Sequence, residues 1–389
     1  MHTTTALATL TLLTSTALAQ TPSLTIIEPP ADQAATRSTV LSRDGSTVGG
    51  FALPSGRGFT WSRPGGYRDF TEANGYNGFY TPFALSPTGD VVVGGKFSTT
   101  EQARAFRRVG ATSVEDLGSP WNASFTQGSK SILGMWTNQT GTRVIASVQR
   151  RIGSGAPQIS PFVWTQEANS WQPLIPSQQS LSDYVDVNDA SDDGTVVVGQ
   201  VNEGSIFGAT RGFVHRADTG YSLLTVPTSN SIGWTAQAVN ASGNIIVGDH
   251  GTAFRIGNAV VWRDGVPTLL PNLANYTIAT ALDVTDDGNM VIGTALSLTQ
   301  PDTTFVWTLA GGTRSLTAYL ADYAVSLPGE YTILSIHLSG DGNTIAGYYQ
   351  PTLNGENVGE SRAFVFTIPA PSSILLLSAG TLALTRRRR

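Results

Sequence analysis

Residues 189–200 read DASDDGTVVVGQ, and this short stretch decides the fold. A polar turn built on Gly194 leads into an apolar run, Val196 to Val198. An aspartate–glycine pair supplies the positive backbone φ that a tight hairpin requires. Three consecutive valines predict a strand that is covered on both faces, because a strand with one wet face alternates apolar and polar residues.

The same pattern occurs seven times along the chain, so the sequence is a repeat. The other copies are VLSRDGSTVGG at 40–50, ALSPTGDVVVGG at 84–95, TNQTGTRVIAS at 137–147, AVNASGNIIVGD at 238–249, DVTDDGNMVIGT at 283–294 and HLSGDGNTIAGY at 337–348. The seven turn glycines are Gly45, Gly89, Gly141, Gly194, Gly243, Gly288 and Gly342. Successive turn glycines are 44 to 54 residues apart, so each unit is close to 50 residues long.

Two further elements follow each turn. The second element ends, copy by copy, at Trp61, Arg108, Trp164, His215, Trp262, Trp307 and Phe366. The third element ends at Phe70, Leu117, Leu174, Leu224, Leu270 and Leu316, and the seventh unit lacks it. Residues 23–27, SLTII, are similar to the third-element segment SLLTV at 222–226. We therefore expect residues 23–27 to pair with the strand near 363–366 and to complete the seventh unit.

These elements predict an all-β fold, a seven-bladed β-propeller over residues 20–367 that is closed by the N-terminal strand. Radial packing of small sheets around an axis gives every sheet two neighbours and protects the sheet edges, which explains strands that are apolar on both faces. Blade periods of about 40–50 residues are typical of this architecture. An open solenoid and two packed β-sandwiches are the alternatives.

The turn and FxW repeats resemble the HAF family of extracellular repeats, which occur in secreted and surface proteins of bacteria. The resemblance spans residues 37–366. The second and fourth copies depart from it, because Arg107-Arg108 and His215 stand where other copies have tryptophan. The resemblance implies an extracellular location and brings no molecular function.

Residues 1–19 predict a signal peptide. An apolar and threonine-rich stretch leads into Ala17-Leu18-Ala19, the small-x-small pattern that a signal peptidase accepts, so we expect cleavage before Gln20. The segment lacks a positively charged start. A buried N-terminal helix or strand is the alternative.

Residues 368–389 predict a sorting tail. Pro369 and Pro371 keep the chain extended, and Ser372 can cap an apolar helix that runs to Thr385. A helix of about 14 residues is roughly 20 Å long, which is short for a bilayer core of about 30 Å. The four terminal arginines, Arg386 to Arg389, favour the cytoplasmic side. We expect a transient inner-membrane anchor that holds the body outside.

The order Pro369-Ala370-Pro371-Ser372, apolar run and basic end resembles the PEP-CTERM sorting signal of Gram-negative surface proteins. That resemblance implies processing near the proline motif by an exosortase-like enzyme. The chain departs from the motif by carrying Ala370 where the family has glutamate. An ordinary C-terminal tail anchor is the alternative.

Charge and cysteine content exclude several classes of function. The chain has no cysteine, which removes disulfides, thiolate metal sites and cysteine nucleophiles. Without its two terminal segments the body has 19 basic and 28 acidic residues, a net charge of −9. Such a body has no electrostatic reason to bind nucleic acid or an anionic membrane surface.

Clustered aspartates suggest either turn chemistry or Ca²⁺, which takes six to eight oxygen ligands. The clusters are Asp183, Asp186, Asp189, Asp192 and Asp193, and then Asp283, Asp286 and Asp287. Neither follows the order of an EF-hand loop, so turn chemistry is the favoured interpretation. The sequence indicates no other cofactor.

The sequence offers no recognisable catalytic set. His2, His215, His250 and His337 are far apart, and no G-x-S-x-G elbow is present. Residues 42–47, SRDGST, resemble the Asp-box turn of sialidases, S-x-D-x-G-x-T-W, but lack one residue. Four tryptophans lie off the repeated FxW element and suit either the core or a sugar ring: Trp121, Trp136, Trp171 and Trp234.

The sequence as a whole predicts an exported, non-catalytic interaction protein of the cell surface or extracellular matrix. Its expected partners are glycans or other surface proteins, besides the two processing enzymes. An extracellular enzyme that acts on polysaccharide, a glycosidase or lyase, is the main alternative. A structural coat component is the other.

Overall fold

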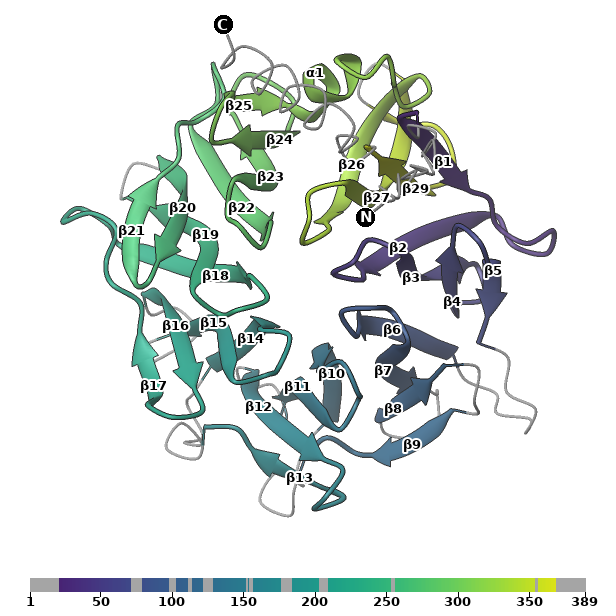
Figure 1. Ribbon diagram of the computed structural model, residues 1–389, viewed down its shortest axis with the longest axis vertical. Helices are drawn as coiled ribbons and strands as arrows, with labels where there is room; N and C mark the ends of the chain where they lie inside the picture. The colour runs from purple at the N-terminus through teal and green to yellow at the C-terminus, as the bar shows by residue number, and fades with distance from the viewer. Residues whose placement is uncertain are drawn as a thin grey trace, which may run out of the picture.

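The computed structural model describes residues 21–70, 79–97, 103–110, 114–121, 129–151, 153, 157–175, 184–202, 209–252, 256–353 and 356–368. In this part of the chain the secondary structure consists of strands and one short helix, α1 (Leu316–Ala321). Figure 1 shows the strands in successive groups around a central axis, and the first strand of each group lies nearest that axis. We number these groups as units 1 to 7.

The strands of each unit follow one another along the chain. Unit 1 contains β2 (Ala35–Leu41), β3 (Thr47–Leu53), β4 (Arg57–Ser62) and β5 (Gly66–Asp69). Unit 2 contains β6 (Phe79–Leu85), β7 (Val91–Phe97), β8 (Arg104–Val109) and β9 (Glu115–Gly118). Unit 3 contains β10 (Ser129–Thr137), β11 (Arg143–Arg151), β12 (Gln158–Thr165) and β13 (Ser170–Pro173). Unit 4 contains β14 (Tyr184–Ala190), β15 (Val196–Asn202), β16 (Thr210–Arg216) and β17 (Gly220–Leu223).

Units 5 and 6 have the same order of strands, whereas unit 7 takes one of its strands from the start of the chain. Unit 5 contains β18 (Gly233–Val239), β19 (Ile245–Gly251), β20 (Gly257–Arg263) and β21 (Val266–Leu269). Unit 6 contains β22 (Ile278–Val284), β23 (Met290–Leu296), β24 (Thr303–Thr308) and β25 (Gly312–Ser315). Unit 7 contains β26 (Glu330–Leu338), β27 (Thr344–Leu353), β28 (Glu356–Asn357), β29 (Arg362–Thr367) and β1 (Ser23–Ile27).

Hydrogen bonding within each unit is antiparallel, and the units are separate sheets with one exception. Units 3 and 4 form a single eight-stranded sheet through one parallel pair, Ile159 with Tyr184. In unit 7 the strand order is β1-β29-β27-β26. β1 pairs with β29 from Ser23↔Thr367 to Ile27↔Ala363, which is the pairing that the sequence predicts for residues 23–27. The first strand of the chain therefore lies at the outer edge of its last sheet.

Each of the seven turn glycines has a φ between +69° and +77°, in the left-handed region. The turn of unit 4 shows why the sequence folds in this way. The Asp193 carboxylate accepts a hydrogen bond from the Thr195 N–H at 2.9 Å, and the Ser191 hydroxyl donates to it at 2.7 Å. Ser191 Oγ in turn accepts from the Val196 N–H at 3.0 Å, which starts the second strand. Polar residues of the motif thus satisfy the backbone at the hairpin.

The consecutive valines are buried on both faces, as the sequence predicts. Val196 and Val198 belong to an apolar cluster between units 4 and 5, whereas Val197 belongs to the cluster between units 3 and 4. A cluster of buried apolar residues lies at each boundary between successive units, and another lies between units 7 and 1. The core is therefore divided among the spaces between sheets.

One third element differs from the expected strand. β25 ends at Ser315, and Leu316 begins helix α1, because the Ser315 hydroxyl caps the helix by accepting from the Ala318 N–H at 3.2 Å. Leu316 and Leu320 still face the core of units 6 and 7.

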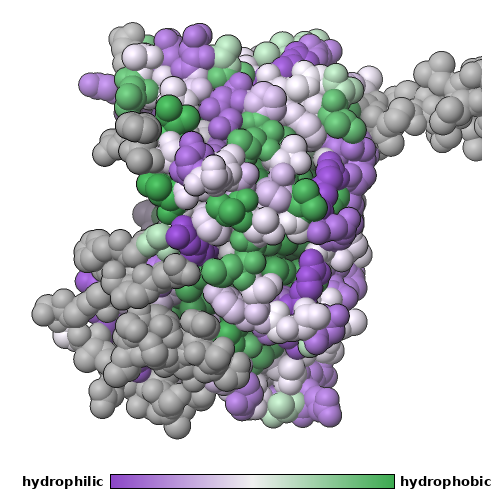
Figure 2. Space-filling view, turned by 90° about the vertical axis from the view of Figure 1, so that its left-hand side faces the viewer, coloured by the Kyte–Doolittle hydropathy of each residue, from purple (hydrophilic) through white to green (hydrophobic). Residues whose placement is uncertain are grey.

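The side of the molecule that carries β17 and β21 shows hydrophobic residues among hydrophilic ones (Figure 2). Leu223 on β17 is 42% exposed and Val266 on β21 is 66% exposed. Individual exposed apolar side chains of this kind are normal on a protein surface.

The predicted terminal signals, residues 1–19 and 368–389, lie outside the described residues except for Ile368. In the described ranges no helix has the length and apolar character that crossing a membrane requires.

Candidate functional site

A cavity of about 250 Å³ lies on the axis, and we call it the axial cavity. Its wall is formed by the innermost strands β2, β6, β10, β14, β18, β22 and β26. Each strand contributes the residue five positions before its turn glycine: Val40, Ala84, Trp136, Asp189, Ala238, Asp283 and His337. One repeat position therefore supplies a ring of side chains in which two aspartates and a histidine stand among apolar residues.

A β-bulge interrupts every innermost strand. The extra residues are Thr39, Phe83, Leu133, Asn188, Gln237, Leu282 and Leu334. In units 3 and 7 the bulge lies two residues earlier than in the other units, and Leu133 and Leu334 are not part of the cavity wall. A bulge redirects side chains and increases local twist. Here it brings Phe83, Gln237 and Leu282 into the wall.

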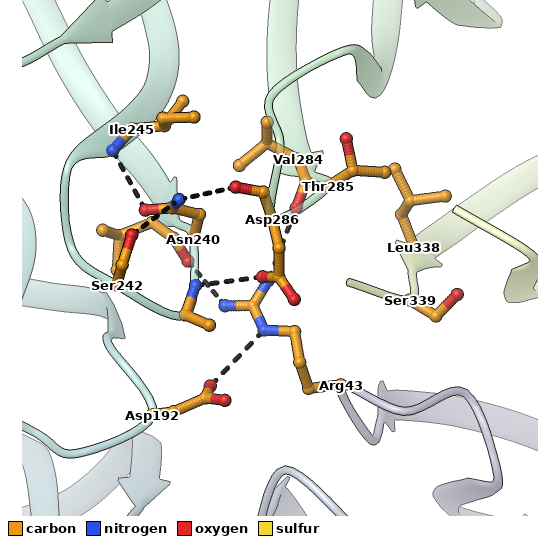
Figure 3. Close-up of polar contacts among 12 residues, drawn as sticks. Arg43, Asp192, Asn240, Ser242, Ile245, Val284, Thr285, Asp286, Leu338 and Ser339 are labelled. Atoms are coloured by element: carbon orange, nitrogen blue, oxygen red, sulfur yellow. Dashed lines mark hydrogen bonds and ion pairs between the residues drawn. The ribbon is translucent and has the colours of Figure 1, made fainter. Parts of the chain in front are cut away.

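Arg43 closes the end of the axial cavity at which the turns lie. It comes from the turn of unit 1 and reaches units 4, 5 and 6 on the other side of the axis (Figure 3). Its Nη2 donates to the Val239 carbonyl at 2.7 Å and its Nη1 to the Val284 carbonyl at 3.4 Å. These two carbonyls end the inner strands β18 and β22.

Four aspartates surround the Arg43 guanidinium. Its Nε lies 3.5 Å from a carboxylate oxygen of Asp192, and its Nη1 lies 3.7 Å from one of Asp286. Burial opposes the charge of Arg43, but the nearby carboxylates outweigh that effect and raise its pKa. They belong to Asp189, Asp283, Asp286 and Asp192. One permanent cation thus neutralises part of an acidic end of the axis.

Asp189 and Asp283 use their carboxylates to join neighbouring units. Asp189 Oδ2 accepts from the Val239 N–H of unit 5 at 2.9 Å, and Asp283 Oδ2 accepts from the Leu338 N–H of unit 7 at 2.8 Å. The other oxygen of each accepts from the next N–H of its own strand. Burial raises the pKa of Asp189 to about 7 against the opposing effect of Arg43, and burial also raises the pKa of Asp283.

His337 completes the polar part of the wall. Its Nε2 lies 2.9 Å from the Ser335 hydroxyl, and burial lowers the pKa of the imidazole to about 4. The ring is therefore neutral at pH 7 and adds no positive charge to the acidic end of the axis.

At this end, backbone hydrogen bonds join the turns of units 1 and 2, units 4 and 5, units 6 and 7, and units 7 and 1. The N–H groups of Asp44, Asp192, Asp286 and Gly340 donate to the carbonyls of Pro87, Ala241, Gly340 and Arg43, at 2.9, 3.2, 2.7 and 2.7 Å respectively. The last of these bonds joins unit 7 to unit 1. These bonds hold the turns of neighbouring units together at the end of the axis where Arg43 lies.

The aspartates of the two sequence clusters have different roles in the structure. Asp193 and Asp287 hold their own turns, whereas Asp189 and Asp283 lie on inner strands and face the axis. Asp186 accepts a hydrogen bond from the Ser147 hydroxyl of unit 3. Asp183 lies outside the described residues. Among the described residues no three acidic or histidine side chains converge as metal ligands would.

The other sequence candidates are dispersed. His250 is buried in unit 5, where its Nδ1 accepts from the Asn258 N–H at 3.2 Å, and His215 lies on β16. Of the tryptophans off the FxW element, Trp171 and Trp234 are buried between units, and Trp136 is a buried part of the cavity wall. The processing residues Ala17, Ala19, Gln20, Pro369, Ala370, Pro371 and Ser372 lie outside the described residues.

Sequence reasoning did not identify Arg43. The signal was present at one repeat position, two residues before the turn glycine, which holds Arg43, Pro87, Gln139, Asp192, Ala241, Asp286 and Gly340. One base and two acids at equivalent positions of a ring face the same axis. In a ring, these opposite charges predict that Arg43 contacts Asp192 and Asp286 across the axis.

Comparison with known proteins supports the fold and adds no function. No protein-family model matches the sequence, and no curated protein matches it. The structure is similar to that of an oligogalacturonate lyase from Vibrio parahaemolyticus, with 9% identity and a TM-score of 0.57 over 90% of this chain and 98% of that one. It is also similar to a prolyl endopeptidase, with 12% identity and a TM-score of 0.53 over 85% of this chain.

The chain spans about half the length of the prolyl endopeptidase, 47%. A weaker likeness, to TolB from Acinetobacter baumannii, has a TM-score of 0.42 at 12% identity and covers 74% of this chain and 64% of that one. At these identities the likeness to the lyase and to the endopeptidase concerns the fold alone, and the likeness to TolB carries no argument. The chain therefore has an all-β, propeller-like architecture.

Proposed function

We propose that the chain is a closed seven-bladed β-propeller that acts as an exported, non-catalytic binding module, with the axial cavity as its ligand site. Three contacts between the ends of the chain support the closure. β1 pairs with β29, Gly340 donates to the Arg43 carbonyl, and an apolar cluster containing Ile27 and Val365 packs against Phe59 of unit 1. Closure leaves the axial cavity as a concave site that all seven units build.

One observation carries the non-catalytic part of the proposal: the charged groups of the cavity are engaged with the protein itself. Both oxygens of Asp189 and of Asp283 accept backbone N–H groups, and Arg43 binds two carbonyls beside Asp192 and Asp286. A general acid or base must be within hydrogen-bond reach of the reacting group and free to exchange its proton. Asp189, Asp283 and Arg43 instead bind the protein backbone, so they stabilise the wall of the axial cavity.

The cavity chemistry favours a neutral ligand. One arginine faces four aspartates, so the axial end retains a negative charge that repels anionic polymers, in line with a net charge of −9 for the body. The rest of the wall combines Phe83, Met135 and Trp136 with the amide side chain of Gln237. Aromatic and amide groups suit the apolar and hydroxyl faces of a neutral sugar or a loop of a partner protein.

Export and surface location form the second half of the proposal. They rest on residues 1–19, on the proline motif at 369–372 and on the resemblance to HAF repeats, and they bring in a signal peptidase and an exosortase-like enzyme. We propose no Ca²⁺ or other cofactor for the binding function.

A polysaccharide-acting enzyme is the second candidate, and one observation favours it. Asp189 has a pKa of about 7 and faces the same cavity as His337, and perturbed groups of this kind gather at catalytic sites. In a glycosidase or lyase, Asp189 would be the proton-transferring group. A coat component without a ligand is the third candidate.

Binding to polysaccharides separates these functions. The full-length chain is incubated with dextran, starch and a β-1,3-glucan, and both retention and release of reducing ends are measured. The proposal predicts retention without release. Phe83→Ala and Gln237→Ala should each weaken retention by about fivefold or more, since each removes a wall contact worth roughly 1 kcal/mol.

The matched controls are Leu133→Ala and Leu334→Ala, which alter bulge residues that are 40% and 51% exposed and outside the wall. Equal effects of all four changes would contradict the axial site. Release that disappears in Asp189→Asn would establish the enzyme instead. Neither retention nor release, together with a surface partner found by crosslinking on whole cells, would favour the coat component.

A further inference from the structure

A second cavity, of about 390 Å³, lies between units 1 and 2, away from the axis. Its wall includes Thr47, Thr60, Arg68, Asp90 and Arg108, together with the turn at Gly65 and Gly66. It adjoins the β4–β5 hairpin on one side and the end of β8 on the other. We call it the lateral cavity.

The lateral cavity lies where the repeat changes its residue type. The last residue of the second element faces the preceding unit and is normally a large ring: Trp164 lies between units 2 and 3, Trp262 between units 4 and 5, and Phe366 between units 6 and 7. All three are at most 1% exposed. In unit 2 this position is Arg108, so a cation occupies the boundary between units 1 and 2.

Arg108 is held in place but is not neutralised. Its Nη2 donates to Thr60 Oγ1 at 3.3 Å, and its guanidinium carbon lies 4.1 Å from the centre of the Phe70 ring. Its Nε is buried and has no hydrogen-bond acceptor among the described residues. An unsatisfied buried donor costs free energy of about 1–3 kcal/mol and is a place where an acceptor is favoured.

A second guanidinium faces the same space. Arg68 is exposed on β5, and no ion pair involves it within the described residues. Burial lowers the pKa of Arg108, and the positive charge of Arg68 lowers it further, so the two side chains repel each other. Asp90 is on the exposed rim, where its carboxylate accepts from the Thr88 hydroxyl at 2.8 Å.

The neighbouring residue shows what a structural arginine looks like in this unit. Arg107 faces unit 3, where its Nη2 pairs with Glu115 at 2.5 Å and its Nη1 donates to the Gly141 carbonyl at 2.6 Å. Its guanidinium carbon also lies 4.9 Å from the centre of the Trp164 ring. Arg107 therefore has an acidic partner, whereas Arg108 has a buried N–H donor without an acceptor among the described residues.

We propose that the lateral cavity binds a small oxyanion, a carboxylate, sulfate or phosphate group, with Arg68 and Arg108 as its ligands and Thr60 as a neutral donor. Guanidinium groups bind these anions through paired N–H donors, and the anion removes the repulsion between the two cations. The group is either a free inorganic ion or the acidic substituent of a sugar, which the remaining volume can accommodate. This site is independent of the axial cavity and of the ligand proposed there.

Calorimetric titration of the full-length chain with sodium sulfate, sodium phosphate, glucuronate and glucose, at constant ionic strength in chloride, tests the proposal. We expect the anions to bind and glucose not to bind. Tighter binding of glucuronate than of the inorganic ions would assign an acidic sugar, and the reverse order would assign a free ion. No heat of binding with any of the anions would overturn the site.

Three variants locate the binding. Arg108→Gln and Arg68→Gln should each weaken it roughly tenfold, the effect of one charge-assisted hydrogen bond. Arg108→Trp restores the residue of the repeat, so it should abolish binding while the melting temperature stays the same or rises. The control is Arg151→Gln, which removes an exposed charge on unit 3. Anion binding that persists in Arg108→Trp, or that weakens equally in Arg151→Gln, would contradict the assignment.

Discussion

At the scale of single residues, Arg43 joins four units of the molecule through one side chain. It belongs to unit 1 and contacts units 4, 5 and 6, and its side chain is only 15% exposed. Its removal leaves several aspartates near the axis without their cation. Breaking a buried charge cluster by removing one partner typically costs about 3–5 kcal/mol.

We therefore expect Arg43→Met to lower the free energy of unfolding by about 3 kcal/mol, measured by urea denaturation. Methionine keeps much of the side-chain volume, so lost packing contributes little. The control is Arg151→Met at the exposed end of β11, where we expect a change within about 1 kcal/mol. Equal effects of the two substitutions would show that the axial contacts of Arg43 are weak.

Asp189 gives the molecule a pH dependence of defined sign. Its pKa is about 7 in the folded state, whereas an unfolded aspartate has a pKa near 3.9, so the folded state holds the proton more tightly. Its contribution to stability is then complete below about pH 4 and is lost as the pH rises to about 7. Asp283 changes in the same direction.

This contribution is measured as the difference in unfolding free energy between the wild type and Asp189→Asn from pH 4 to pH 8. We expect the wild-type advantage to fall as the pH rises through this window, with most of the loss complete just above pH 7. A difference that is independent of pH, or that grows with pH, would contradict the raised pKa.

At the scale of elements, the turn glycine Gly194 both adopts a left-handed conformation and allows close packing, and a comparison with Gly220 of the β16–β17 hairpin separates the two effects. Gly194 has a φ of +71°, and a Cβ there would lie 2.7 Å from ring atoms of Trp136 in unit 3. Gly220 has a φ of +78° but open space around the same position. Both glycines avoid left-handed strain, and only Gly194 also allows adjacent units to pack closely.

Gly220→Ala should cost about 1–2 kcal/mol of unfolding free energy, the price of the left-handed conformation alone. Gly194→Ala should cost roughly 1–3 kcal/mol more, because the added methyl group forces the Trp136 ring out of its position. Both values come from chemical denaturation. If the two variants are equally destabilised, the turn glycines serve the hairpin only.

Most of the elements could be predicted from the sequence, because each depends on local chemistry that recurs. Consecutive valines require two covered faces, a polar turn with glycine requires a hairpin, and the missing third strand of unit 7 points to residues 23–27. The helix at Leu316 was not predicted, because the equivalent segments of five other units, which also end in a large apolar residue, fit the end of a strand. A serine in the capping position decides the outcome there.

The candidate site could be predicted only in part, because it depends on contacts across the axis. Asp189 and Asp283 occupy the same position of two repeats, which the sequence shows. Aspartates also occupy the turns that follow, so the sequence does not tell which of them face the axis. The bulges that bring Phe83 and Gln237 into the wall leave no sequence mark of their own. Arg43 meets partners about 150 to 240 residues further along the chain, which no local pattern records.

At the scale of the whole molecule, the two terminal signals predict defined masses. Intact-mass spectrometry of cell fractions should show a form that begins at Gln20 and, later, a form that also lacks the tail beyond the proline motif. The proposal assigns the removal of each signal to its own processing enzyme, so each cut should give a defined mass. Recovery of only the full chain, from Met1 to Arg389, would contradict both assignments.

Closure of the ring by the N-terminal strand is the claim on which the axial cavity, and therefore the proposed binding site, depends. Ser23 and Thr367 are direct partners between β1 and β29, and their hydroxyls accept hydrogen bonds from the same Arg63 guanidinium at 2.9 and 2.8 Å. Directly opposed antiparallel residues have Cα atoms about 4.5–5.5 Å apart, which a disulfide spans. The chain has no cysteine of its own to interfere.

The most direct measurement is the yield of disulfide in the double variant Ser23→Cys with Thr367→Cys after mild oxidation, read by mass spectrometry of proteolytic fragments. The matched control is Leu24→Cys with Thr367→Cys, in which the two side chains point to opposite faces of the sheet. A closed ring predicts a nearly complete bond in the first variant and little in the second. Free thiols in both variants, or equal yields, would show that the first strand does not close the ring.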